Sequence, residues 1–168
     1  MLCVGIDACK DGLIDASKRA ARSRKRGGLS NALFVLSSIE ALPADFCSVA
    51  DVITVNYPWG SLLWAMTMPD AAILQKIARM GKSGAALKLL LNWSVFENVA
   101  YCERLGLPKL TLRDVDGRLK AIYDDAGLKI SSHGLSASKA PLTTWGQKLV
   151  KGSDRKVLAI DANVVRSY

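Results

Sequence analysis

Residues 2–37 read LCVGIDACKDGLIDASKRAARSRKRGGLSNALFVLS, and this stretch decides the class of fold. The apolar run at residues 2–6 predicts a buried strand. A helical pattern follows from about residue 10 to residue 24 and stops near Gly27 and Gly28, since helices often end at glycine. The apolar run at residues 32–37 predicts the next strand. Strand, helix and strand in succession are typical of an α/β domain with a mostly parallel sheet.

The rest of the sequence continues this alternation of short apolar runs and helical patterns. Further strands are predicted at residues 51–57, 85–92, 128–132 and 156–164, and helices at about 70–80, 98–104 and 113–126. The continuous apolar run at 85–92 is typical of the middle of a parallel sheet. Residues 136–152 are irregular and polar, and no linker is long enough to divide the chain. We therefore expect a single domain over residues 1–168.

The composition indicates a basic globular protein. Half of the 168 residues are hydrophobic, and 23 Lys and Arg oppose 15 Asp and Glu. The resulting charge of +8 favours a polyanionic partner or an anionic membrane surface. The four cysteines include no C-x-x-C pair, so we expect reduced thiols and no metal site. The longest apolar stretch, residues 85–91, is far shorter than the roughly 20 residues that cross a bilayer. We expect a soluble, intracellular protein.

Two acidic residues follow predicted strands. Asp7 ends the first strand, where an acid can accept hydrogen bonds from both ribose hydroxyls of a nucleotide. The same position suits a helix N-cap, and position alone does not separate the two roles. Glu40 follows the second strand and is expected at the same sheet edge, facing an adenine or an amine of a ligand. Periodicity alone favours a surface carboxylate for Glu40.

Residues 18–26, KRAARSRKR, carry six basic residues in nine and no acid. If the preceding helix extends that far, Lys18, Arg22 and Arg26 share one helical face at four-residue spacing. A solvated helix face is the usual explanation for such a run. The density of charge without intervening acids favours contact with RNA phosphates instead.

The segment Tyr57-Pro58-Trp59-Gly60 follows a predicted strand, which puts Trp59 at the carboxyl edge where open α/β sheets hold ligands. A large aromatic residue between Pro and Gly suits stacking on a base better than burial, with packing over its own loop as the alternative. Trp145 lies in the irregular segment. Together the two tryptophans suit the clamping of an extruded base.

Three further residues are not expected to act on a ligand. Trp64 and Trp93 lie within helical or strand patterns and are expected in the core. His133 has no evident acid or nucleophile as a partner, so we do not expect it to be catalytic.

Four segments together resemble the 16S rRNA (adenine-1408 N1)-methyltransferases, the kanamycin–apramycin type of aminoglycoside resistance enzyme. They are GIDACKDGL (5–13), GGLSNALFVLSSIEALP (27–43), PWGSLL (58–63) and TTWGQKL (143–149). PWGSLL is quite specific, whereas Ile-Asp at a strand end is common to many methyltransferases. The resemblance covers nearly the whole chain. It implies a class I, S-adenosylmethionine-dependent methyltransferase in the cytoplasm, with a Rossmann-like sheet and helices on both of its faces.

The resemblance also implies roles for residues toward S-adenosylmethionine. Asp7 matches the family's ribose-binding acid. The segment around the cofactor's adenine is matched by Ser38, Ile39 and Glu40. The segment beside the cofactor's methionine end and the target base is matched by Pro58, Trp59 and Ser61.

Toward the RNA, the resemblance implies a base clamp and a docking helix. Trp59 and Trp145 match the two tryptophans that hold the flipped adenine. Thr143 matches a small hydroxyl residue near that base, and Arg155 matches a basic residue that supports the flipped nucleotide. The family's basic helix, which docks on 16S rRNA of the 30S subunit, is matched by Lys18, Arg19, Arg22 and Arg26.

One family element has no match in this sequence. The family begins with a strand and a D-x-G-T-G-D-G loop that holds the methionine part of the cofactor, and nothing precedes the strand at residues 2–6. We therefore expect an N-terminally truncated form of the fold. Two alternatives to the methyltransferase stay open: an RNA- or ribosome-binding remnant without cofactor, and a methyltransferase of another nucleic acid. The oligomeric state is left open.

Overall fold

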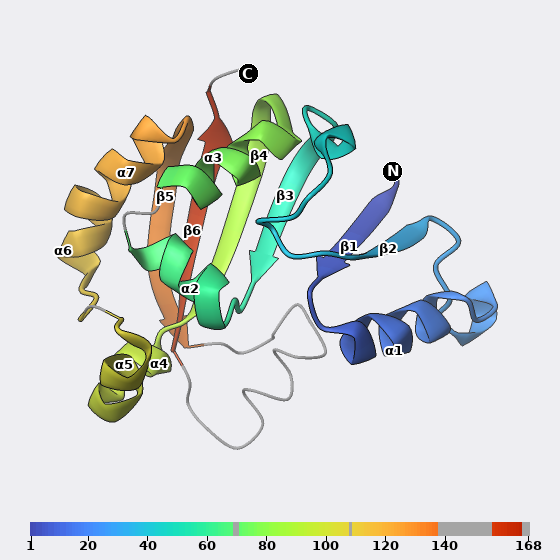
Figure 1. The fold of residues 1–168 in the computed structure, drawn as a ribbon, viewed down its shortest axis with the longest axis horizontal. Coiled ribbons are helices and arrows are strands. Elements are labelled where there is room, and N and C mark those ends of the chain that lie inside the picture. The colour runs from blue at the N-terminus through green and yellow to red at the C-terminus, as the bar shows by residue number, and fades with distance from the viewer. Residues whose placement is uncertain (69–70, 108, 138–155, 166–168) are drawn as a thin grey trace. The chain divides into compact units, whose positions relative to one another are not determined.

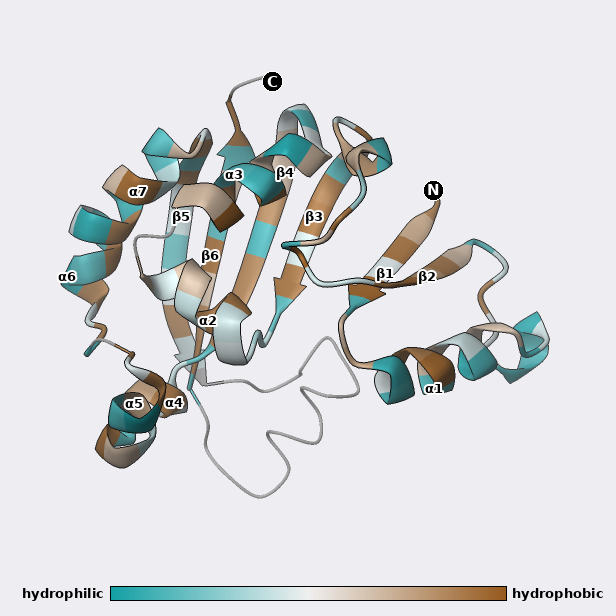
Figure 2. Cartoon of the chain, in the orientation of Figure 1, coloured by the Kyte–Doolittle hydropathy of each residue, from teal (hydrophilic) through white to brown (hydrophobic). Residues whose placement is uncertain are grey.

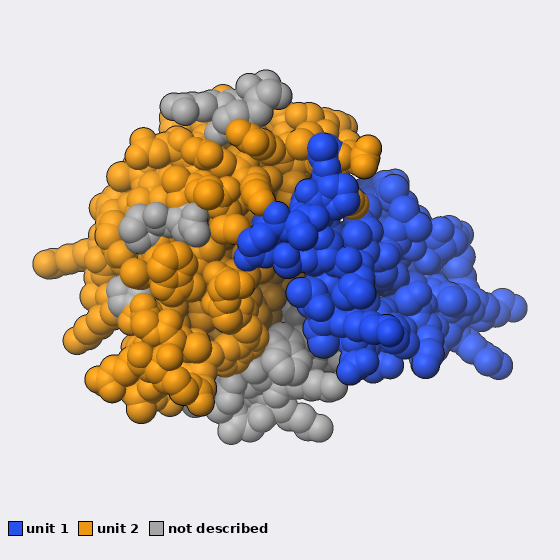
Figure 3. All heavy atoms as spheres, in the orientation of Figure 1, with its two compact units in different colours: residues 1–44 blue, residues 45–168 orange. Residues whose placement is uncertain are grey.

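The computed structural model describes residues 1–68, 71–107, 109–137 and 156–165 (Figure 1). The chain divides into two compact units, residues 1–44 and residues 45–168 (Figure 3). Each unit combines strands with helices, so the predicted α/β class is confirmed. The single domain over residues 1–168 stays a prediction. Of the helices that the described ranges contain, none has the length and apolarity of a membrane span.

The first unit is a strand–helix–strand unit. β1 (Cys3–Asp7) and β2 (Ala32–Leu36) pair in parallel, from Cys3 opposite Ala32 to Asp7 opposite Leu36. α1 (Lys10–Ala20) connects the strands and packs on both. The strands coincide with the apolar runs, which are brown in Figure 2. Because the pair is parallel, the carboxyl ends of β1 and β2 lie at one edge.

The first helix ends earlier than the sequence predicts, at Ala20 rather than near Arg24. A 3-10 turn (Arg24–Arg26) follows, and Gly27 adopts left-handed backbone with a φ of 78°. Gly28 passes so close to Arg22 that a Cβ atom would lie 1.6 Å from the Arg22 carbonyl oxygen. The two glycines thus turn the chain back before the helix can continue. Lys18, Arg22 and Arg26 therefore do not share one helical face.

The second unit contains a four-stranded sheet in the order β3–β4–β6–β5. Its strands are β3 (Ala50–Asn56), β4 (Gly81–Asn92), β5 (Leu128–Ala137) and β6 (Lys156–Val164). β3 and β4 are parallel, whereas β6 is antiparallel to both β4 and β5. β3, β4 and β5 therefore run in one direction, as a mostly parallel sheet requires, and the reversed β6 makes the sheet mixed. Apolar runs indicate burial, but strand direction depends on connections that the runs do not encode.

Helices of the second unit cover one face of this sheet (Figure 1). They are α2 (Gly60–Thr67), α3 (Ala71–Met80) and one helical segment made of α6 (Leu112–Asp114), a π-helical turn (Val115–Leu119) and α7 (Lys120–Asp125). α4 (Ser94–Glu97) and α5 (Val99–Leu105) follow β4, pack on each other and lie beyond the lower end of the strands in Figure 1. A 3-10 turn, Ala44–Phe46, precedes β3. α3 packs on β3, β4 and α7, and α7 packs on β5.

The core lies between this helical layer and one face of the sheet. Along β4, Leu87, Leu89 and Leu91 are at most 1% exposed, while the intervening Lys88 is exposed. This two-residue period gives the strand one buried face. The hydroxyl of Tyr123, buried in α7, donates a hydrogen bond to a carbonyl oxygen of α2 at 3.1 Å. The helical layer is thus held by both packing and a buried polar contact.

The two tryptophans that the sequence places in the core differ in burial. Trp93 is buried, as predicted. Trp64 is 37% exposed, so its prediction is wrong. The neighbouring positions Leu63, Ala65 and Met66 are buried, and the remaining side of α2 carries Trp64 outward. An apolar helical pattern does not show which residue occupies that outer side.

Candidate functional site

The carboxyl ends of β1 and β2 bring two predicted cofactor segments together. Asp7 ends β1, and its carbonyl oxygen accepts the N–H of the first residue after β2 at 3.1 Å. A turn follows, in which the Ala41 N–H donates to the Ser38 carbonyl oxygen at 3.2 Å. Ile39 and Glu40 are the central residues of this turn. The first unit therefore holds Asp7 beside the 38–40 segment, as the sequence predicts.

The carboxylate of Asp7 is exposed and only partly engaged. Its Oδ1 accepts the N–H of Cys9 at 2.8 Å. The N-cap of α1 is Cys9, whose side chain makes no capping bond, so the N-cap role considered for Asp7 is wrong. A carboxylate has acceptor sites on both oxygens. Asp7 can therefore accept hydrogen bonds from a ligand's hydroxyl groups while it keeps its contact with Cys9.

Trp59 lies just after the carboxyl end of β3, in a turn with unusual backbone angles. Tyr57 and Gly60 both have positive φ angles, of 51° and 55°. Tyr57 is 5% exposed, and its N–H donates to the Leu90 carbonyl oxygen at 2.8 Å. A non-glycine residue in this region costs about 1–3 kcal/mol, and such strain clusters at functional sites. Trp59 itself is 41% exposed, so it is not a core residue.

Two neighbours of Trp59 in this turn, Pro58 and Ser61, differ in exposure. Pro58 is half-buried, and Ser61 is exposed in the first turn of α2. The second unit therefore gathers Pro58, Trp59 and Ser61 in one strand-to-helix turn, as the sequence predicts. Their roles toward a cofactor stay predictions.

Trp59 is in contact with a second aromatic residue, Tyr101, which the sequence did not predict as part of the site. The rings of Trp59 and Tyr101 lie 5.2 Å apart between centroids, at an interplanar angle of 80°. The Arg104 guanidinium carbon lies over the Tyr101 ring, 5.1 Å from its centroid. Tyr101 and Arg104 belong to α5. The only sequence signal that could have found them is their one-turn spacing on a helix.

The basic segment of the first unit is fully accessible. Lys18 and Arg19 lie in the last turn of α1, Arg22 lies beyond its end, and Arg26 lies in the 3-10 turn. All six basic residues of segment 18–26 are exposed, and among the described residues none forms an ion pair with a carboxylate. Their charge is therefore available to an external anion.

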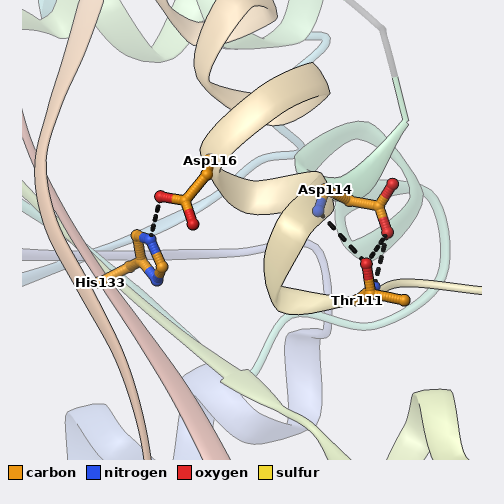
Figure 4. A network of polar contacts seen from close by, with 4 residues as sticks. All are labelled: Thr111, Asp114, Asp116 and His133. Atoms are coloured by element: carbon orange, nitrogen blue, oxygen red, sulfur yellow. Dashed lines mark hydrogen bonds and ion pairs between the residues drawn. The ribbon is translucent and has the colours of Figure 1, made fainter.

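His133 has an acidic partner, contrary to the expectation from the sequence (Figure 4). Its Nε2 lies 2.7 Å from Oδ1 of Asp116, in the π-helical turn. At the start of the same helical segment, Thr111 and Asp114 form a capping box, and the hydrogen bonds from Thr111 lower the pKa of Asp114. The His133 contact joins β5 to the helical layer, which indicates a structural role. The described residues contain no group of three potential metal ligands.

Three predicted site residues lie outside the described residues. They are Thr143, Trp145 and Arg155. Of the predicted tryptophan clamp, the structure therefore describes Trp59 only.

The known proteins that this chain resembles are methyltransferases. The family model described as "NpmA: 16S rRNA (adenine(1408)-N(1))-methyltransferase" matches residues 1–164. The chain is 29% identical over 165 residues to a 16S rRNA (adenine(1408)-N(1))-methyltransferase of Escherichia coli, an alignment that covers 96% of this chain and 75% of the relative.

Solved structures show the same similarity. The aminoglycoside resistance methyltransferase NpmB1 is 38% identical, with a TM-score of 0.80, over 96% of this chain and 75% of that one. A tryptophan-to-alanine mutant of the 16S rRNA (adenine(1408)-N(1))-methyltransferase from Catenulisporales acidiphilia, crystallised with cosubstrate SAM, is 28% identical, with a TM-score of 0.84. That match covers 97% of this chain and 75% of the mutant's chain.

Proposed function

This chain belongs to the 16S rRNA (adenine(1408)-N(1))-methyltransferase family, and from that premise we propose that it methylates N1 of adenine 1408 in the 30S subunit and so confers aminoglycoside resistance. The observation that carries the proposal is the exposed Trp59 in the strained turn at the carboxyl end of β3. Open α/β sheets bind ligands at this edge, and an exposed indole there offers a flat apolar surface to a base.

The reaction needs positioning more than acid–base chemistry. When bound, S-adenosylmethionine supplies an electrophilic methyl group on its sulfonium sulfur. N1 of adenine carries an in-plane lone pair and no proton, so it attacks the methyl carbon directly while the S–CH₃ bond electrons return to sulfur. Holding the two reactants in line supplies roughly 7–11 kcal/mol of barrier reduction. The protein therefore has to hold a base rather than to remove a proton.

Trp59 is the residue that we assign to the base. Methylation at N1 leaves the adenine cationic, and an indole face attracts a cation by ~1–2 kcal/mol at a desolvated site. In the proposal Trp145 provides the second indole, Thr143 contacts the base, and Arg155 supports the flipped nucleotide. His133 has no part in the chemistry of this proposal, because N1 of adenine carries no proton that a base would have to remove.

The first unit supplies the nucleoside end of the cofactor site in this proposal. Asp7 accepts hydrogen bonds from the ribose hydroxyls, for which its exposed, partly engaged carboxylate is suited. Ser38, Ile39 and Glu40 contact the adenine of the cofactor. Pro58 and Ser61 are assigned to the methionine part of the cofactor on the family resemblance alone.

The basic segment docks the enzyme on rRNA. Lys18, Arg19, Arg22 and Arg26 are exposed at the end of α1 and in the turn that follows. A short basic surface reads the positions of phosphates rather than base sequence, so recognition depends on the assembled 30S subunit. We further propose that residues 1–168 act as one cytoplasmic methyltransferase domain.

Calorimetric titration with S-adenosylmethionine tests the cofactor site. Wild-type chain is expected to bind one equivalent. Asp7→Asn keeps an oxygen for the Cys9 N–H but loses the charge and an acceptor, so its affinity should fall roughly 10- to 100-fold, because a hydrogen bond to a charged group contributes 1.5–3 kcal/mol. Asp15→Asn, at an exposed position on α1, is the matched control and should bind like wild type. Equal affinities in all three proteins would refute the role of Asp7.

The same titration separates the alternatives. No binding by wild-type chain, together with intact binding to 30S subunits, would favour the RNA-binding remnant. Cofactor binding with methylation of an RNA other than 16S rRNA would favour the other methyltransferase.

A further inference from the structure

The turn that carries Trp59 fixes the path of its backbone but not the orientation of its ring. Tyr57 and Gly60 fix the path of the chain on either side. The indole is attached beyond that path by two rotatable bonds, and 41% of the residue is exposed. A side chain with so much exposure needs a specific contact to hold one orientation. Among the described residues, the ring contact of Trp59 is with Tyr101.

Tyr101 is itself held firmly. Its backbone N–H donates to Oδ1 of Asn98, the N-cap of α5, at 3.0 Å. The next residue, Cys102, is 8% exposed, and its thiol donates to the Val95 carbonyl oxygen at 3.3 Å. α5 is therefore anchored at the turn that carries Tyr101.

The ring of Tyr101 is also braced from one side. The Arg104 guanidinium lies over that ring, one helical turn further along α5, which is the geometry of a cation–π contact. Burial raises the pKa of Tyr101, and the Arg104 charge opposes that shift. A tyrosine ring carries negative charge density on its faces, to which the Arg104 cation is attracted. Arg104, Tyr101 and Trp59 thus form a row that runs from α5 to the exposed turn.

The right angle between the two aromatic rings matters for ligand binding. In a pair near 80°, the edge of one ring meets the face of the other. If Tyr101 offers its edge, one face of Trp59 is used and the other is available. If Trp59 offers its edge, both of its faces are available. In either arrangement the contact with Tyr101 leaves at least one indole face uncovered by that ring.

We propose that Tyr101 is a positioning residue that orients the indole of Trp59 for stacking on the target base. The inference rests on the proposed function for the identity of that base, but the contact itself rests on the rings alone. Tyr101 touches neither cofactor nor reacting atoms in this account, and acts through Trp59.

Kinetics of 30S methylation test the effect on function. Tyr101→Leu should lower kcat about 2- to 10-fold, the range expected from losing an edge-to-face pair. KM for 30S subunits should be unchanged, because docking depends on the basic segment. Tyr101→Phe keeps the ring and should retain wild-type kcat. Val99→Ala, at a position that is 68% exposed on the same helix, is the control for a general disturbance of α5.

A spectroscopic readout needs no catalysis. The chain has four tryptophans, so the emission of Trp59 is obtained by subtracting the Trp59→Phe spectrum from the parent spectrum. Acrylamide should quench this component more strongly in Tyr101→Leu than in wild type, and equally in Tyr101→Phe and wild type. Thermal unfolding of each variant shows that it is folded.

The outcomes separate this inference from the proposed function. Unchanged quenching and unchanged kcat in a folded Tyr101→Leu would overturn the positioning role, as would a Tyr101→Phe variant as impaired as Tyr101→Leu. If wild-type chain methylates no 30S subunits, the proposed function fails, and the quenching experiment still decides whether Tyr101 orients Trp59.

Discussion

A methyl group at Gly28 should disorder the loop that presents the basic segment. The Cβ atom of Gly28→Ala would lie 1.6 Å from the Arg22 carbonyl oxygen and 2.4 Å from its carbonyl carbon. Ordinary contacts between non-bonded heavy atoms are about 3.5–4.0 Å. Both clashing atoms belong to the backbone, so no side-chain rotation relieves the overlap, and the returning chain has to move away from Arg22.

The free-energy cost of this movement follows from the hydrogen bonds that hold the returning chain against residues 20–23. The Gly28 N–H donates to the Ser23 carbonyl oxygen at 3.1 Å, and the Leu29 N–H donates to the Ala20 carbonyl oxygen at 2.8 Å. Separation of the two chain segments breaks both bonds. At about 1 kcal/mol for each, the closed loop loses about 2 kcal/mol relative to open forms.

Two other glycines provide matched controls. Gly27→Ala places a methyl in open space at a φ of 78°, so only the left-handed backbone opposes it, at about 1–2 kcal/mol. Gly12→Ala also meets open space, inside α1, and should stabilise the helix by up to about 1 kcal/mol. The three variants should therefore rank Gly12→Ala, Gly27→Ala, Gly28→Ala in order of falling loop stability.

Amide hydrogen exchange at Leu29 measures this loop directly. A loss of 2 kcal/mol corresponds to about 30-fold faster exchange in Gly28→Ala. Trypsin should also cut segment 18–26 faster in that variant, because cleavage requires local unfolding of the backbone, which the open loop allows. Wild-type exchange at Leu29 in a folded Gly28→Ala protein would show that the described crossing of Gly28 and Arg22 is wrong.

Further predictions concern the base, the rRNA and the core. Trp59→Ala should abolish 30S methylation while S-adenosylmethionine affinity by calorimetry stays at the wild-type level, and full methylation by the variant would remove Trp59 from the mechanism. Changing Lys18, Arg19 and Arg22 to Glu should weaken 30S binding in filter assays and reduce its salt slope by about 0.7–0.9 per lost phosphate contact; an unchanged slope would argue against docking through this segment. Tyr123→Phe should lower the free energy of unfolding by about 1 kcal/mol, because a buried hydrogen bond is lost. Burial raises the pKa of Tyr123, so wild-type stability should fall as pH rises above about 10, where the unfolded chain ionises, and the Phe variant should lose less in denaturant titrations.

The strands and the cofactor-side edge could be predicted from the sequence because their signals are local. A strand such as β4 is an unbroken apolar run, and Asp7 follows another run directly. Two strands joined by a helix bring their carboxyl ends to one edge, so the neighbourhood of Asp7 and Glu40 follows from the order of elements. The family resemblance added roles that these patterns alone left open.

What the sequence did not predict depends on contacts between distant residues. The direction of β6 is set by pairing with β4 and β5, and its apolar run looks the same in either direction. His133 and Asp116 lie on different elements, as do Trp59 and Tyr101. The early end of α1 depends on the close passage of Gly28, which a helical pattern does not encode.

Primer extension on 16S rRNA tests the central claim most directly. Purified 30S subunits are incubated with the chain and S-adenosylmethionine, and reverse transcriptase is then run through the decoding region. Methylation at N1 blocks base pairing, so we predict a stop at adenine 1408 that depends on both chain and cofactor. Complete read-through at adenine 1408, under conditions where the chain binds cofactor and 30S subunits, would contradict the proposed function.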